Sequence, residues 1–102
     1  MTSKNMEHDT ALDLLACDIT ARPANAPSLE QIAPSITARA RRGETMLEIS
    51  FADDARDLVA AAVAAERLCC TEIGWDLVLE PSPRLTISGT PAQIDLLAQL
   101  LG

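Results

Sequence analysis

Three side chains that can bind a metal ion or act in catalysis lie close together near the end of the alanine-rich segment 53–76. They are Glu66, Cys69 and Cys70, at positions i, i+3 and i+4. If the segment is helical, these spacings bring the three side chains to one side of its last turns. A carboxylate beside two thiols can hold a soft cation, or can combine an acid–base group with a nucleophile.

The segment 53–76 predicts one long helix that ends just before Gly74. Projection at about 100° per residue predicts an inner face that Glu66 shares with apolar residues, whereas Leu68 is expected on the far side. We therefore expect Glu66 to be buried or nearly so. The other members of this face are Leu58, Val59, Ala62, Val63, Cys69 and Ile73.

A carboxylate among apolar neighbours must be neutralised, hydrogen-bonded, paired or bound to a cation. Arg67 is next in sequence, but it is expected to point away. Two simpler interpretations stay open. The stem of Glu66 can pack while its head reaches water or the backbone, and the cysteines can serve only as small packing residues.

Composition restricts the classes of partner. The 102 residues carry a formal net charge of −7 and a pI of about 4.4, which argues against nucleic acid and anionic membranes as partners. No stretch is long and apolar enough for a membrane span, and the polar start does not resemble a secretion signal. The sequence therefore predicts a cytoplasmic protein, in which three cysteines are expected to be reduced thiols.

The pattern of apolar and turn residues predicts a single α+β domain over 11–102, preceded by a flexible tail over 1–10. The expected architecture is a two-layer sandwich with a mostly antiparallel sheet of about four strands and three helices, in the order β-α-β-α-β-β-α. The expected strands are 11–19, 45–51, 75–80 and 84–88. The expected helices are 28–43, 53–76 and one that begins at Pro91, capped by Thr90 and Gln93. The segment 11–19 also fits a short helix; if it is a strand, Cys17 would face the core or the helix packed on it.

The sequence also resembles a family of small, largely uncharacterised bacterial proteins that carry a Glu-x-x-Cys-Cys signature. The residues that carry this resemblance are Ala16, Cys17, Glu66, Cys69, Cys70, Trp75, Leu77 and the run 87–91. Thr71 and Glu72 stand where that family has Pro-Phe. Members of the family are found beside, or fused to, heavy-metal-responsive regulators. The resemblance therefore implies a function connected with heavy metals.

Three functions fit these residues. In the first, Cys17, Cys69 and Cys70, with Glu66 nearby, bind a soft ion such as Zn(II), Cu(I), Hg(II) or As(III). In the second, a thiol-dependent enzyme uses Cys70 or Cys69 as nucleophile and Glu66 as acid or base, for metal–carbon or thiol-exchange chemistry on a small thiol-reactive ligand. The negative end of the helix disfavours a free thiolate and so opposes this function.

The third function is a structural homodimeric module, in which Leu68 marks the contact between two copies. Glu66 and the cysteines would then be packing residues without a chemical role.

Overall fold

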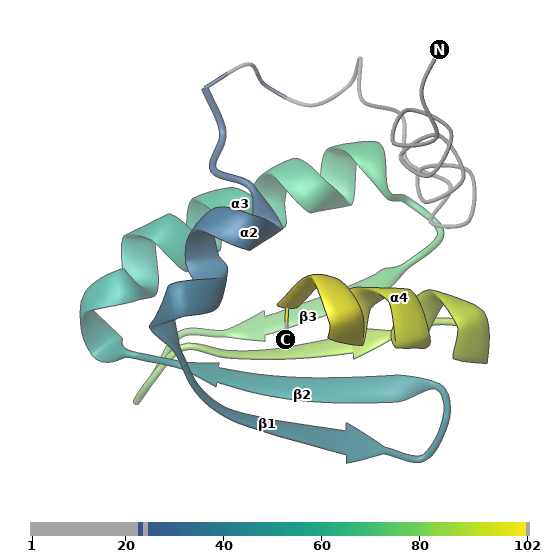
Figure 1. The fold of residues 1–102 in the computed structure, drawn as a ribbon. Coiled ribbons are helices and arrows are strands. Elements are labelled where there is room, and N and C mark those ends of the chain that lie inside the picture. Colours follow the sequence, from purple (N-terminus) through teal and green to yellow (C-terminus); the bar gives the residue numbers. More distant parts are fainter. Residues whose placement is uncertain (1–22, 24, 102) are drawn as a thin grey trace, which may run out of the picture.

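The computed structural model describes residues 23 and 25–101, which form four strands and three α-helices. The strands make one antiparallel sheet in the order β1-β2-β4-β3, and the helices lie on one of its faces (Figure 1). In chain order the elements are α2 (Leu29–Ile32), the 3-10 turn η2 (Ala33–Ser35), β1 (Ile36–Arg42), β2 (Met46–Phe51), the 3-10 turn η3 (Asp53–Ala55), α3 (Arg56–Cys69), β3 (Gly74–Val78), β4 (Arg84–Ser88) and α4 (Pro91–Leu101).

The core lies between the sheet and the helices. Along the central strands β2 and β4, fully buried residues alternate with more exposed ones. Leu47 pairs with Ile87 and Ile49 with Leu85, and all four side chains are buried. Directly opposed residues of an antiparallel pair point to the same face, so these pairs turn together towards the helices. Trp75 of β3 continues the row opposite Ile87. The two-layer α+β sandwich with its antiparallel sheet is confirmed.

The predicted helix over 28–43 is wrong beyond its first turn. Ser28 and Gln31 form the expected capping box, but α2 covers only four residues before the chain passes through η2 into β1. Pro34 has no N–H to donate to a continuing helix, and the residues after it, Ile36 and Thr37, are β-branched and favour a strand. Pairing of β1 with β2 then decides the conformation.

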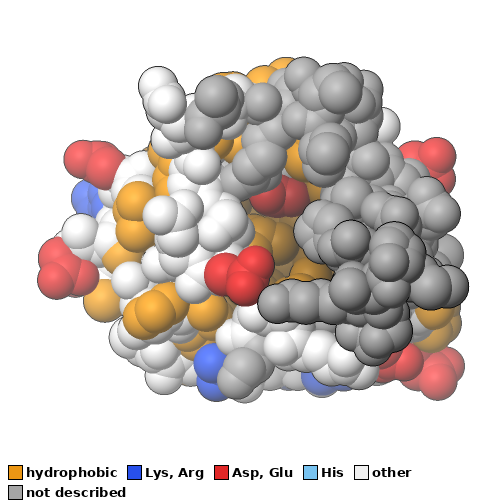
Figure 2. Space-filling model, turned by 45° about the horizontal axis from the view of Figure 1, so that its top comes forward, with side chains coloured by type: hydrophobic (Ala, Val, Ile, Leu, Met, Phe, Trp, Pro, Cys, Tyr) orange, Lys and Arg blue, Asp and Glu red, His pale blue; other side chains and the backbone are white. Residues whose placement is uncertain are grey.

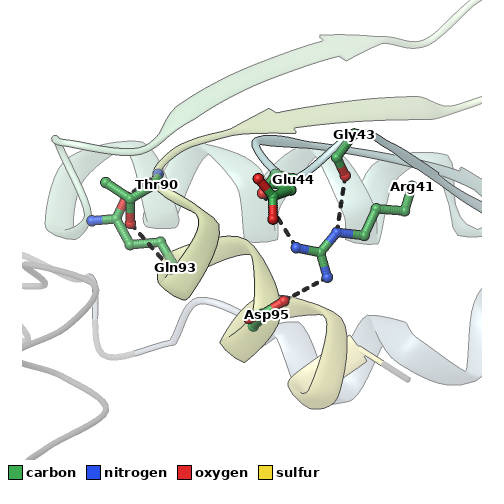
Figure 3. Close-up of polar contacts among 6 residues, drawn as sticks. All are labelled: Arg41, Gly43, Glu44, Thr90, Gln93 and Asp95. Atoms are coloured by element: carbon green, nitrogen blue, oxygen red, sulfur yellow. Dashed lines mark hydrogen bonds and ion pairs between the residues drawn. The ribbon is translucent and has the colours of Figure 1, made fainter.

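The arginines in this segment consequently lie on β1, an edge strand of the described sheet, and not on the helix that was predicted over 28–43. Arg39 donates to the carbonyl of Leu101 at the end of α4. Arg41 forms an ion pair with Asp95 of α4, and it also donates to the carbonyls of Gly43 and Glu44 in the β1–β2 turn (Figure 3). These contacts attach the edge of the sheet to α4.

The predicted start of the last helix is confirmed. The backbone N–H of Gln93 donates to the Thr90 hydroxyl, and the side-chain oxygen of Gln93 accepts from the Thr90 N–H, which completes a capping box (Figure 3). Pro91 takes the first helical position, where its missing N–H costs nothing.

The central helix α3 is shorter than the predicted 53–76, because it ends at Cys69 and a turn leads into β3. Val59, Ala62 and Val63 are buried as expected, but Leu58 is 41% exposed, so its placement on the inner face was wrong. The angle around the axis does not explain this exposure, because Ala65 and Cys69 lie within about 20° of Leu58 and are buried; Leu58 differs from them in lying in the first turn of α3.

Two expectations fall outside the described residues: the strand over 11–19, which contains Cys17, and the tail over 1–10. Among the helices that are described, none combines the length and the apolar character needed to cross a membrane.

Gly43 allows a stability prediction for the β1–β2 turn. Its φ is +70°, and a Cβ placed there would meet no atom within 4 Å, so substitution changes only the backbone conformational energy. We expect Gly43→Ala to lower the free energy of unfolding by about 1–2 kcal/mol. Gly43→Asn should cost less, because Asn tolerates this conformation. Urea denaturation measures both, and an Ala variant as stable as the parent would contradict the assignment.

Candidate metal centre

Glu66, Cys69 and Cys70 form a compact buried cluster at the C-terminal end of α3. Their exposed fractions are 7%, 4% and 1%. The two sulfurs lie 3.5 Å apart, and Oε1 of Glu66 lies 3.8 Å from the Cys69 sulfur and 3.3 Å from the Cys70 sulfur. One ligand atom from each residue therefore falls within 4.8 Å of the others, as a shared metal ion would require. The predicted burial of Glu66 beside both cysteines is confirmed.

The two sulfurs differ in chemical state. Cys69 is not in a disulfide and keeps its thiol, whereas Cys70 is disulfide-bonded. The expectation of reduced thiols therefore does not hold for Cys70. In this state only Cys69 has a proton to donate to Glu66. The short separation between the Cys70 sulfur and Oε1 becomes a hydrogen bond only when Cys70 is reduced.

The helix ends where it does because the backbone of Cys70 is held by several hydrogen bonds. Its N–H donates to the carbonyl of Glu66 (2.7 Å), which closes the last helical turn. Its carbonyl accepts from the N–H of Ile73 (3.3 Å) and from the indole N–H of Trp75 (3.1 Å). Cys70 has left the helical conformation (φ −111°, ψ 68°). This departure lets adjacent residues direct their sulfurs towards one point, which a regular helix does not allow.

Arg67 fixes the same turn from the other side. Its Nε and Nη2 both donate to the carbonyl of Trp75, at 3.2 and 2.8 Å. Arg67, Trp75 and Cys70 thus form a chain of hydrogen bonds, which we call the α3 clamp. It joins the end of α3 to β3. The sequence analysis did not foresee this structural role of Arg67. The available signal was Trp75, because an indole that is largely buried usually donates its N–H to a partner.

Electrostatics at the cluster favour a cation over an isolated anion. The carbonyls at the C-terminal end of a helix carry a partial negative charge, and the cluster lies at that end of α3. Glu66 adds a carboxylate to the same place. Both features stabilise a bound cation, and both oppose a free thiolate nucleophile.

The structure brings together three of the four predicted site residues: Glu66, Cys69 and Cys70. Cys17, the fourth, lies outside the described residues. On the side of the molecule that carries the helices, hydrophobic side chains are visible next to acidic ones (Figure 2).

Comparisons with protein-family models, with curated proteins and with solved structures found no match for this chain. The resemblance to Glu-x-x-Cys-Cys proteins is thus a hypothesis, and the geometry of the cluster carries the functional argument.

The α3 clamp predicts a stability effect for Trp75→Phe, which keeps the aromatic ring and removes the indole N–H. The carbonyl of Cys70 then loses the indole donor, and the free energy of unfolding should fall by about 1 kcal/mol or more. Arg67→Met keeps the aliphatic stem and removes the donors to Trp75. Because both variants act on one turn, their effects should combine less than additively. Chemical denaturation of both single variants and the double variant tests this, and full additivity would argue against a single coupled clamp.

Proposed function

We propose that this protein binds a soft metal ion through Glu66, Cys69 and Cys70 when both cysteines are reduced. The observation that carries the proposal is the separation of 3.3–3.8 Å among one oxygen and two sulfurs that are all buried. Thiolates select soft and borderline cations such as Zn(II) and Cu(I), and the same softness extends to Hg(II) and As(III).

Cys17 is part of the proposal as an additional thiolate ligand, because it is the remaining cysteine of the chain. The resemblance to proteins found beside heavy-metal-responsive regulators points to the same class of ligand. Metal binding requires deprotonated thiols, so it should release protons and weaken as the pH falls.

The disulfide at Cys70 supports a second candidate function, thiol–disulfide exchange. The sulfur of Cys69, which is not in a disulfide, lies 3.5 Å from the Cys70 sulfur. In such an exchange Cys69 would lose its proton and attack Cys70, a Cys69–Cys70 bond would form, and the former partner sulfur would leave and take up a proton. No electrons are gained or lost. A bond between adjacent cysteines demands unusual backbone geometry, so the metal function is preferred.

The metal function predicts a ligand-dependent rise in stability after reduction. A cation that binds only the folded chain at one hundred times its Kd adds about 2.7 kcal/mol to the free energy of unfolding. Thermal unfolding of the reduced protein, with Zn(II), Cu(I), Hg(II) or arsenite and without a cation, should therefore reveal an increment. It should collapse in Cys69→Ser and in Cys70→Ser. Cys17→Ser should reduce it if Cys17 is a ligand.

Leu68→Ser is the matched control, because Leu68 is on the same helix but is 55% exposed and contributes no ligand atom. It should keep the full increment. An unchanged midpoint with every cation would refute the metal function. If the increment is absent and Leu68→Glu instead splits a dimer in solution, the homodimeric module replaces the metal function.

Thiol–disulfide exchange makes a different prediction. Cys69→Ser should abolish rearrangement of the disulfide, and peptide mass spectrometry detects this rearrangement.

A further inference from the structure

The separations within the cluster also carry information about the coordination geometry, and hence about the class of ion. This inference rests on the proposed metal function and deepens it. With Zn–S bonds of about 2.3 Å and Zn–O bonds of about 2.1 Å, tetrahedral angles place two sulfurs about 3.8 Å apart. The same angles place a sulfur and a carboxylate oxygen about 3.6 Å apart.

The observed separations match this pattern on all three edges. The sulfur–sulfur distance is 3.5 Å, and the two oxygen–sulfur distances are 3.3 and 3.8 Å. Each lies within about 0.3 Å of the corresponding tetrahedral edge. Glu66, Cys69 and Cys70 thus occupy positions close to three corners of one coordination tetrahedron.

A linear two-coordinate ion, as Cu(I) and Hg(II) form with two thiolates, would need a different arrangement. At metal–sulfur bonds of about 2.3 Å its two sulfurs would be about 4.6 Å apart. The sulfurs of Cys69 and Cys70 would have to separate by about 1 Å, and the backbone of Cys70 is held by the α3 clamp and by the N–H of Ile73. The fixed turn therefore disfavours linear coordination by this pair.

We propose that the reduced cluster is a four-coordinate site for Zn(II), in which Glu66 is a direct ligand together with Cys69 and Cys70. The fourth corner is taken by a donor outside these three residues. Mixed oxygen and sulfur ligands at a tetrahedral ion are within the range that Zn(II) accepts in proteins. Three negatively charged donors at the negative end of α3 also suit a divalent ion better than a monovalent one.

Co(II) is the probe for this geometry, because it replaces Zn(II) and its visible spectrum distinguishes tetrahedral from octahedral sites. Titration of the reduced full chain should give the intense visible bands of tetrahedral Co(II) and a near-ultraviolet sulfur-to-cobalt band. Zn(II) should displace the Co(II) and abolish both. Cys69→Ser and Cys70→Ser should each remove part of the sulfur-to-cobalt band.

Glu66→Gln tests the direct ligand, and Glu72→Gln is its control. Both remove one negative charge near Cys70, but Glu72 is exposed and outside the cluster. We expect Glu66→Gln to weaken Zn(II) binding by at least about tenfold, as the loss of a supporting group alone can do. Glu72→Gln should leave the affinity within about twofold. X-ray absorption of the Zn(II) form should show four ligands, including an oxygen.

The outcomes separate this inference from the proposed function. If no cation binds through the thiols, the proposed function fails. If Hg(II), Cu(I) or arsenite binds in a thiol-dependent way while Zn(II) and Co(II) do not, only the tetrahedral assignment fails. It fails as well if Co(II) is octahedral, or if Glu66→Gln binds Zn(II) as tightly as Glu72→Gln does.

Discussion

The hydrogen bond from the indole of Trp75 to the carbonyl of Cys70 is the contact on which the site depends. It joins the first turn after α3 to the strand β3, and Arg67 supports it by binding the carbonyl of Trp75. Because Cys70 is pulled out of the helical conformation at this point, its sulfur approaches that of Cys69. Glu66, one turn earlier in α3, lies beside both sulfurs. This local backbone constraint thus brings the sulfurs of two adjacent residues, Cys69 and Cys70, to the same point as the Glu66 carboxylate.

The sheet and the helices around it were largely predictable, because their patterns depend on local periodicity. The alternation of Leu47, Ile49 and Phe51 predicted a half-buried strand, and Thr90 with Gln93 predicted the start of α4. The segment 28–43 was not predictable in this way. Its apolar residues fit helical spacing, but β1 pairs with β2 across a short hairpin, and this pairing overrides the local preference.

The candidate site was predictable in composition but not in geometry. The wheel projection placed Glu66 on the buried face beside Cys69 and Cys70, and the structure bears this out. The convergence of two adjacent sulfurs depends on where the helix ends, and helix ends are poorly determined by periodicity. The disulfide state of Cys70 could not be predicted either, since an odd number of cysteines in an acidic chain favoured thiols.

The arginines of β1 have a consequence for how this sheet can associate with another. An edge strand exposes unpaired N–H and C=O groups that can template further strands. A second copy of β1 added at this edge would bring Arg39, Arg41 and Arg42 of both copies together along one short seam. Like charges on neighbouring strands destabilise their pairing, and Arg39 and Arg41 already hold α4. In the described part of the chain, the sheet is thereby discouraged from growing past β1, and the register irregularity between Ile36 and Ala38 adds to this effect at the start of the strand.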